Sequence, residues 1–270
     1  MVLFLVSITI LLVGSVGYFT YRIPPILTIL LNSAGLYIGF TVLHDSVHGV
    51  AHRRRLAGRA LGTVIGFLLT FTYPFFRGVH MRHHAHANDR RLDPDSITAS
   101  LSVAAVPFLG GFAVYASYHY HFYRERMWRT RAELAEVVGC QMFYLCILIA
   151  SLLGGWFPQL LTVWVFPLIL TLLFLVFTFD YLPHFPHDST DRLQNARAYG
   201  GVMTAVLHLN QNYHLIHHLW PRIPWFRYRQ VYLLTRNELA RAGARITHAP
   251  AKEKIGSDGP RDHSAVRKAG

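Results

Sequence analysis

Histidine is concentrated in three short clusters of this 270-residue chain, which contains 17 histidines in all. Imidazole is the commonest protein metal ligand and suits iron, copper and zinc. The clusters lie beside apolar segments and read His44-Asp-Ser-Val-His48, His80-Met-Arg-His83-His84 and His214-Leu-Ile-His217-His218. They predict a site for more than one metal ion at the edge of a membrane.

The spacing within each cluster suits an α-helix that presents its histidines on one face. His44 and His48 are four residues apart, and the other two clusters share the spacing HxxHH. A surface position or an ordinary polar contact would explain one such histidine, but it explains eight in three clusters poorly. We therefore expect all eight to be metal ligands: His44, His48, His80, His83, His84, His214, His217 and His218.

Further histidines follow the last apolar segment, in Asp180-Tyr-Leu-Pro-His184-Phe-Pro-His187. We expect His184 to be a ninth ligand, and His187 to be a ligand or a hydrogen-bonded neighbour of one. Asp180 is expected to act in catalysis, by holding a metal-bound water or by orienting a ligand ring. His52 is either a ligand or a neighbour of one. We expect surface or ordinary polar roles for His86, His119, His121, His208, His248 and His263.

The donor set narrows the choice of metal. Zinc sites use about four ligands, and structural zinc sites favour cysteine. Soluble di-iron bundles use Glu-x-x-His motifs, which this sequence lacks. The pattern that remains is a pair of irons held almost wholly by neutral imidazoles, which would leave the irons strongly cationic and suit oxidation by O2. Copper stays compatible with this composition.

The apolar segments that must position these residues predict about four membrane spans. The chain is 52% hydrophobic and only 15% charged, and several windows approach the ~20 apolar residues that cross a bilayer. Two helical hairpins are expected, from segments 2–20, 26–43, 137–153 and 160–179. Arg53, Arg54, Arg55 and Arg59 follow the second span and mark the histidine side as cytoplasmic.

Segment 60–76 is apolar but contains Gly62, Gly66 and Pro74. A simple third span there would place His80 across the membrane from His44, which a shared metal site forbids. We therefore predict that this segment enters the membrane without crossing it, or lies along the interface; a crossing span is the alternative. Segment 100–118 is expected at the interface.

Composition also limits the class of protein. The net charge of +12 reflects basic flanks of membrane spans rather than nucleic-acid binding. Cys140 and Cys146 suggest no disulfide framework, and the sequence lacks a dinucleotide fingerprint, so electrons must come from another protein. The first 18 residues are expected to be a retained span rather than a signal peptide. We expect one domain, 1–242, and a basic, disordered tail, 243–270.

The three clusters resemble the histidine boxes of the membrane fatty-acid desaturase and hydroxylase superfamily, in the same order. The longer stretches HDSVHGVAHR, HMRHHAHANDRRLDPD, FDYLPHFPH and NQNYHLIHHLWPRIPW resemble the bacterial β-carotene hydroxylases of this superfamily. The resemblance covers roughly residues 30–230. Related carotene ketolases typically have a last box closer to HHEHH, and acyl desaturases usually lack the DYLPHxPH run.

This resemblance implies an all-α integral membrane enzyme whose interfacial helices and histidine-rich di-iron cap lie on the cytoplasmic side. The enzyme would use two iron ions and O2 to hydroxylate C3 of a carotenoid β-ionone ring, in a bacterial inner membrane with both termini cytoplasmic. A ferredoxin-like protein would donate electrons. An acyl desaturase or a carotene 4-ketolase on the same site is the alternative. A metal-storage or transport protein is disfavoured, because the histidines lie at span ends rather than within a path through the bilayer.

Aromatic residues near the span ends are expected to line the substrate site: Phe71, Tyr73, Phe75, Phe76, Phe177 and Phe179. Trp220 and Trp225 suit an interfacial aromatic belt. Surface arginines are expected to contact lipid headgroups or an acidic ferredoxin: Arg53, Arg54, Arg55, Arg222, Arg227 and Arg229.

Overall fold

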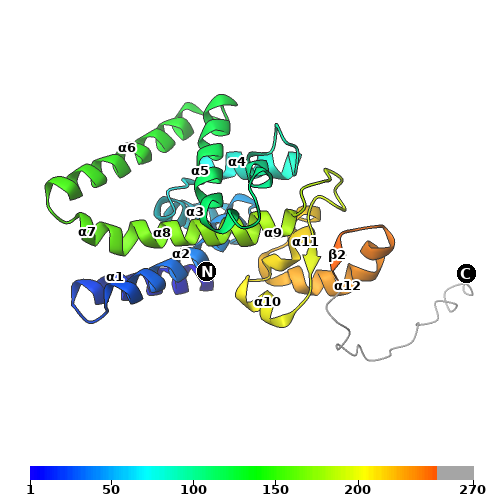
Figure 1. Cartoon of the computed structure of the whole chain (residues 1–270), viewed down its shortest axis with the longest axis horizontal. Helices are drawn as coiled ribbons and strands as arrows, with labels where there is room; N and C mark the ends of the chain where they lie inside the picture. Colours follow the sequence, from blue (N-terminus) through cyan, green and yellow to red (C-terminus); the bar gives the residue numbers. More distant parts are fainter. Residues whose placement is uncertain (248–270) are drawn as a thin grey trace, which may run out of the picture.

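The computed structural model describes residues 1–247, and its regular structure is almost entirely helical (Figure 1). Four helical runs are long and apolar enough to cross a membrane: α1 (Val2–Phe19), α2 (Pro25–Val47), α6 (Arg131–Leu153) and the run Phe157–His184. The prediction of an all-α integral membrane protein with about four spans is confirmed. The last run consists of α7 (Phe157–Leu160), the π-helix η2 (Leu161–Val165), α8 (Phe166–Leu175), the π-helix η3 (Val176–Tyr181) and α9 (Leu182–His184).

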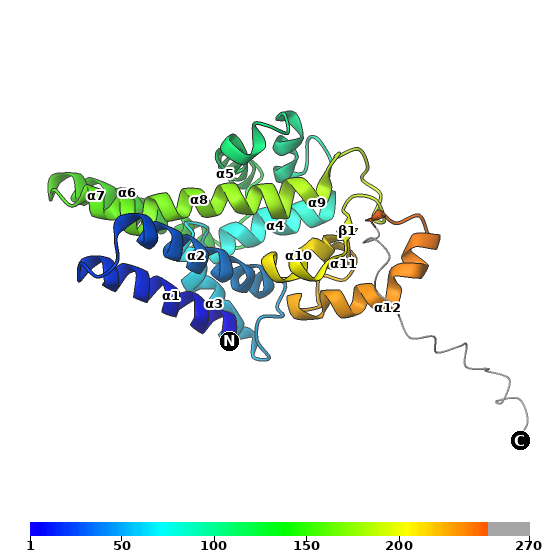
Figure 2. The same cartoon turned by 60° about the horizontal axis from the view of Figure 1, so that its bottom comes forward.

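Small and polar side chains hold the first hairpin together inside the apolar region. A Cβ atom on Gly35 would lie 3.2 Å from the backbone oxygen of Ser7, so glycine allows α1 and α2 to approach closely. The Ser7 hydroxyl donates to the Gly35 carbonyl at 2.7 Å. The Asn32 amide donates to Val163 O at 2.7 Å, which ties α2 to the last span. Figures 1 and 2 show α1 and α2 beside the run from α7 to α9.

Segment 60–76 does not cross the bilayer as one straight helix. It belongs to α3 (Arg55–Leu68) and α4 (Tyr73–His86), which meet at an angle of 96°. A helix that ends inside a membrane must find partners for its last carbonyl groups. Tyr144 donates to Phe67 O at 3.0 Å, and the Trp164 indole donates to Leu68 O at 2.8 Å. Side chains of two true spans therefore satisfy the end of α3, and α4 can return towards the end of α2.

A buried ion pair fixes the position of α4. The guanidinium of Arg77 donates two hydrogen bonds to the carboxylate of Glu133, at 2.7 and 2.8 Å. Both residues are buried, and Glu133 lies in the first turn of α6. The bidentate geometry, typical of strong arginine–carboxylate pairs, locks the histidine-bearing helix against the start of a membrane span.

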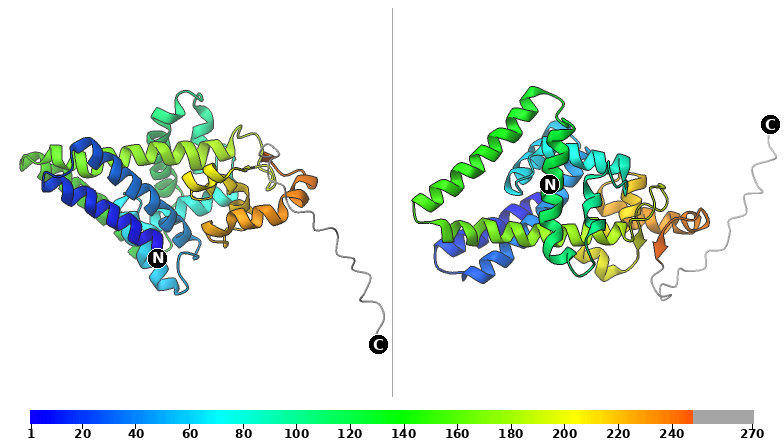
Figure 3. Two further views of the ribbon diagram at one scale, coloured as in Figure 1. Left: turned by 90° about the horizontal axis from the view of Figure 1, so that it is seen from below. Right: turned by 45° about the horizontal axis from the view of Figure 1, so that its top comes forward.

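The chain after α9 forms a cap at one end of the bundle (Figure 3). The cap contains β1 (Ala198–Tyr199), α10 (Val202–Leu207), the 3-10 helix η4 (Gln211–Tyr213), α11 (His214–Leu219), the 3-10 helix η5 (Trp225–Arg227), α12 (Tyr228–Arg241) and β2 (Ile246–Thr247). Its helices surround buried Tyr213, Leu215, Ile216 and Tyr228. The 3-10 helix η1 (Pro94–Ser100) and α5 (Val106–Arg124) lie between α4 and α6 in the chain, and α5 packs against α8.

The strands β1 and β2 pair in parallel. Ile246 and Thr247 belong to the segment expected to be a disordered tail, so that expectation does not hold for these two residues. They pair because the Ala198 amide donates to Arg245 O at 3.1 Å, directly before β2. Gly243, Ala244 and Arg245, the first three residues of the expected tail, are also described, and residues 248–270 lie outside the described part of the chain.

The returning path of α3 and α4 predicts that both of their outer ends face one side of the membrane. Single cysteines at Arg55→Cys and Arg91→Cys, in a chain with Cys140 and Cys146 replaced by serine, should react with a membrane-impermeant maleimide from the same side of sealed vesicles. Tyr21→Cys, in the turn between α1 and α2, should react from the opposite side because Tyr21 is 98% exposed there. Labelling of Arg55→Cys and Arg91→Cys from opposite sides would show that the segment crosses.

Candidate metal centre

Nine histidine side chains converge at one end of the bundle in two groups. In each group the nitrogen atoms that could bind a metal all lie within 4.8 Å of one another. The first histidine group contains His44, His48, His80, His84 and His217, and the second contains His83, His184, His214 and His218. The structure thus brings together all nine histidines that the sequence nominates as ligands.

The helical spacing of the boxes explains how the groups are divided. Residues four positions apart, such as His80 and His84, lie one above the other on a helix and join the same group. His83 points to the side and joins the second group. The third box divides in the opposite sense, because His214 and His218 lie in the second group and His217 in the first. We expected each box to present one face to a shared site; the structure instead lets each HxxHH box contribute to both groups.

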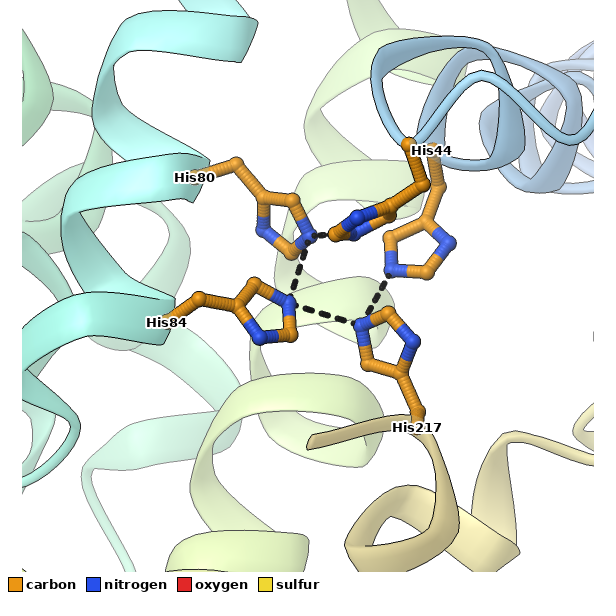
Figure 4. Close-up of side chains that lie close together, drawn as sticks. His44, His80, His84 and His217 are labelled. Atoms are coloured by element: carbon orange, nitrogen blue, oxygen red, sulfur yellow. Dashed lines mark hydrogen bonds between the residues drawn. The ribbon is translucent and has the colours of Figure 1, made fainter. Parts of the chain in front are cut away.

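The separations of the ring nitrogens fit bound metal ions. In the first group, Nε2 atoms lie 2.8 Å apart between His84 and His217, 3.0 Å between His44 and His217, and 3.2 Å between His80 and His84. Figure 4 shows these four rings turned towards one another from α2, α4 and α11. Neighbouring donors around an ion at about 2.1 Å from each nitrogen lie about 3 Å apart. The donor set and its spacing therefore fit one ion in each group.

The hydrogen bonds on the far side of the rings leave the Nε2 atoms as acceptors. In this arrangement Nδ1–H of His83 donates to Asp93 at 2.9 Å, and that of His184 donates to Asn195 O at 2.7 Å. Nδ1–H of His217 donates to the Tyr228 hydroxyl at 2.9 Å. A neutral imidazole has one N–H and one lone pair, so these bonds direct three lone pairs into the groups. Nε2 of His184 is buried without a hydrogen-bond partner.

Burial favours the neutral, metal-binding form of the third box. Loss of solvent lowers the pKa of His214, His217 and His218 well below the ordinary histidine value, and repulsion by neighbouring histidines lowers it further. Neutral rings are the form that ligates metal, so these three rings can accept a cation without first releasing protons.

Asp180 lies at the wall of the site but in neither histidine group. It is buried in η3, and neither carboxylate oxygen makes a hydrogen bond of normal geometry. It lines an apolar cavity of about 620 Å³ together with His44, His80, His83 and His214. An acceptor without a partner beside metal ligands can hold a water molecule or a polar group of a bound substrate.

The cavity meets the expectation for some aromatic residues and not for others. Phe71, Phe76 and Phe179 line it. Phe75 is buried instead against His119 and Phe122. Tyr73 and Phe177 are not among the lining residues, because Tyr73 donates to Ser46 O and receives Arg59 over its ring, while Phe177 stacks near Tyr181.

A second opening reaches the histidines from the polar side. It contacts His84 of the first group and His218 of the second, and its other lining residues are Ala85, His86, Ala87, Asp89, Thr190, Arg192, Asn195 and Pro221. The two groups therefore lie between an apolar cavity and a polar cleft.

The other histidines lie outside both groups. His187 is buried with Nδ1 3.3 Å from Asn88 Oδ1, and its Nε2 has no partner; burial lowers its pKa to about 4. Nδ1 of His52 accepts a hydrogen bond from Arg54 N. Ordinary hydrogen bonds occupy His119, His121 and His208, and His86 lines the polar cleft. His248 and His263 lie outside the described residues.

Sequence reasoning did not identify Asp93, Asp95 and Tyr228 as part of the site. Besides His83, the carboxylate of Asp93 accepts from the backbone amides of Asn88 at 2.7 Å and Asp95 at 2.9 Å. A carboxylate of Asp95 also lies 3.2 Å from His83 Nδ1. The acid pair in Asp93-Pro-Asp95 shortly after the second box was a usable signal, whereas Tyr228 lies in no distinctive pattern.

Comparisons with known proteins agree with this geometry. Residues 21–250 match the protein family described as "Fatty acid desaturase". The chain is 30% identical over 204 residues to the "Beta-carotene ketolase" of Paracoccus sp. (strain PC1), a match that covers 72% of each protein.

Two plant and algal relatives match at lower identity. The "Fatty acid conjugase FAC2 A" of Calendula officinalis is 24% identical over 77% of this chain and 66% of its own length. The "Acyl-lipid (7-3)-desaturase" of Diacronema lutheri is 22% identical over 83% of this chain and 60% of its own length. This chain spans less than two thirds of the length of these two proteins.

Removal of one imidazole should weaken metal binding in the group that contains it more than in the other group. We expect His217→Ala to lower metal content from two ions per chain towards one, because the first group loses the ring that contacts both His44 and His84. Elemental analysis of purified protein measures this. His121→Ala is the matched control, since that ring only bonds to Glu125; equal metal contents for the two variants would contradict the assignment.

The role of Asp93 predicts a loss of metal affinity without loss of a ligand. Partners that orient metal-bound histidines typically contribute 10–100-fold to affinity, so Asp93→Ala should weaken metal binding by about that factor. Titration with a competing chelator gives the measurement. Asp191→Ala, which removes an exposed carboxylate bonded to Leu193 N, should leave affinity unchanged. Metal affinity of Asp93→Ala equal to wild type would show that Asp93 does not orient His83.

Proposed function

The chain belongs to the fatty acid desaturase family, and we propose that it is an O2-dependent di-iron monooxygenase that hydroxylates C3 of the β-ionone ring of carotenoids such as β-carotene. The observation that carries the proposal is the apolar cavity that ends against the histidine groups. A neutral, apolar ring placed there lies beside the metal ligands. The similarity to a beta-carotene ketolase supports a carotenoid substrate.

The lining of the cavity supports a neutral substrate end. Phenylalanine, leucine and valine contribute eight of its lining residues, and its carboxyl groups are those of Asp95 and Asp180. No lysine or arginine lines it, so an anionic headgroup would meet carboxylates instead of a cation. A hydrocarbon ring carries no charge, so its burial here does not incur the free-energy cost of burying an unpaired anion.

The proposed ligands are the nine histidines of the two groups, which would hold two iron ions. Bound iron would supply the activation of O2 and the removal of hydrogen from an unactivated C–H bond. The chain itself orients His83, His184 and His217 through their outer hydrogen bonds. Its apolar cavity excludes water from the substrate side, which limits side reactions of an oxidising centre.

Two polar groups in the cavity wall suit the oxygenated product. Asp180 is an acceptor without a hydrogen-bond partner, and the buried Gln211 amide is a donor without one. We propose that Asp180 is a catalytic residue that hydrogen-bonds to water or to the new hydroxyl group. Gln211 could donate to the same oxygen.

The alternative activities use the same site on a related substrate. The ketolase relative favours carotene 4-ketolation as the second candidate, and the conjugase and acyl-lipid desaturase relatives favour an acyl chain. What supports hydroxylation is the sequence of the third box, His214-Leu-Ile-His217-His218, together with the run from Asp180 to His187. These stretches resemble the hydroxylases more than the ketolases.

The proposal extends to the cellular setting. A ferredoxin-like donor would supply electrons on the polar side, where the cleft at His84 and His218 includes Arg192, a cation that suits an acidic partner. The bacterial inner membrane, with the site and both termini cytoplasmic, fits the arginines after α2. One catalytic domain, residues 1–242, would carry all of this activity.

Product analysis tests the proposal. Expression in a host that makes β-carotene and contains a ferredoxin system should yield β-cryptoxanthin and zeaxanthin, which chromatography separates from the parent pigment. A carbonyl at C4 would support the ketolase instead, and a new double bond in membrane acyl chains would support the desaturase. Unchanged pigments and lipids with folded, iron-loaded protein would refute the proposal.

The role of Asp180 can be separated from metal binding. Asp180→Asn keeps the size of the side chain but removes the carboxyl group, and we expect turnover to fall by about 100-fold, the lower range for acid–base groups. Metal content should stay at the wild-type value, because Asp180 lies in neither group. Asp188→Asn, at an exposed acid paired with Arg245, is the control. Full turnover of Asp180→Asn would exclude the catalytic role.

A further inference from the structure

A second apolar hollow lies between α5 and α8, further from the histidines than the cavity. It has an empty volume of about 570 Å³, and its lining contains no charged residue: Thr70, Gly111, Phe112, Tyr115, Val165, Leu168, Ile169, Leu172 and Leu173. Phe112 is 54% exposed and α8 belongs to a membrane span, so this hollow adjoins the region that lipid occupies. We call it the outer hollow and the cavity at the histidines the inner cavity.

One face of the last span lines both spaces. Val165, Leu168 and Leu172 line the outer hollow, and Leu172, Leu175 and Phe179 line the inner cavity. These residues are three or four positions apart, the spacing of one helix face. At 1.5 Å per residue, the stretch from Val165 to Asp180 is about 22 Å long. The two spaces therefore follow one another along the same stripe of side chains, which ends at the histidine groups.

The two spaces meet where α5 crosses α8 (Figure 3). Gly111 and Leu172 line both. A Cβ atom on Gly111 would lie 3.0 Å from Leu173 N and 3.1 Å from Leu172 C, so the helix backbones nearly touch here. Because glycine has no side chain, Leu172 provides the only side chain that borders both spaces.

We propose that the outer hollow and the inner cavity form one passage, controlled by Leu172, through which an elongated, neutral and apolar molecule reaches the histidine groups from the bilayer. This inference deepens the proposed function, on which the identity of the molecule rests. The outer lining has no charged side chain that could bind a headgroup, and the inner lining contains no lysine or arginine. The molecule thus lies along α8 with one end at the metal ligands, an orientation that exposes a terminal ring to oxidation.

A bulky side chain at the junction should block the passage. Leu172→Trp, in full-length protein reconstituted in phosphatidylcholine vesicles, should reduce uptake of β-carotene at least tenfold, measured by pigment absorbance after repurification. Leu170→Trp is the matched control, because Leu170 lies two residues away on the same helix, is 43% exposed and borders neither space. Metal content should match wild type in both variants. Equal uptake by Leu172→Trp and wild type would overturn the proposal.

If Leu172→Trp fails to fold, Ile169→Trp, which lines the outer hollow, is used instead. It should also reduce uptake of β-carotene without changing metal content. Photolabelling with a 16-carbon hydrocarbon that carries a terminal diazirine gives a readout that does not depend on oxidation. Mass spectrometry should find label at Leu168 and at Phe179 in wild type, and the Phe179 label should be lost in the blocked variant. Label confined to the outward-facing Leu170 and Phe174 would show that no passage exists.

The two kinds of failure are distinguishable. If the protein takes up β-carotene and is labelled as expected but oxidises no carotenoid, the passage is supported and the proposed function is refuted. Hydroxylated carotenoid produced at the wild-type rate by Leu172→Trp refutes the passage and leaves the function standing.

Discussion

The rest of the structure depends on the mutual approach of buried imidazole nitrogens. Nε2 atoms of His84 and His217 lie 2.8 Å apart, and those of His83 and His218 lie 3.3 Å apart. Each neutral ring has a single N–H, and the outer bonds to Asp93 and Tyr228 place it away from the centre in two of these rings. A cation shared by the lone pairs makes such an arrangement favourable. Metal bound there would be coupled to folding, because its proposed ligands come from the ends of α2, α4, α9 and α11.

The convergence depends on the 96° bend between α3 and α4, which brings the second box close to the end of α2. A backbone that turns inside a bilayer leaves carbonyl groups that water cannot satisfy, and each unsatisfied group costs several kcal/mol. Tyr144 of α6 and Trp164 of η2 donate hydrogen bonds to the last carbonyl groups of α3, so the second hairpin stabilises this bend. The Arg77–Glu133 pair then fixes the position of α4 against α6. Residues far from the histidines thus help to position the second box.

The parts that sequence reasoning predicted are those that depend on local pattern. Hydropathy located the four spans, and box spacing identified eight of the nine converging histidines, because both signals lie within a few turns of one helix. The ninth, His184, was predicted from its place directly after the last apolar segment. The division of each HxxHH box between two groups was not predictable, since it depends on rings from other helices. The sequence also could not distinguish Phe76, which lines the cavity, from Tyr73, whose side chain contacts Ser46 and Arg59. Asp93 and Tyr228 contact the site through hydrogen bonds to His83 and His217. An isolated residue of this kind makes no repeating pattern in the sequence, so sequence reasoning could not find it. The shift of the α2 end to Val47, which places His44 inside the helix, lies within the usual uncertainty of helix ends.

The register of the boxes orients the centre relative to the membrane. His80 and His214, the first histidines of the two HxxHH boxes, border the apolar cavity, whereas His84 and His218, the last, border the polar cleft. Four residues are one helical turn, so each box extends from the apolar side to the aqueous side of the centre. An oxidation of an apolar molecule by O2 needs this asymmetry, because the reacting carbon must be shielded from water while electrons and protons arrive from it. A centre placed one turn deeper would lose the cleft, and one placed one turn higher would lose the cavity. The repeated spacing therefore does more than supply candidate ligands, since it would hold the proposed metal ions at the boundary between the two environments that the proposed reaction requires.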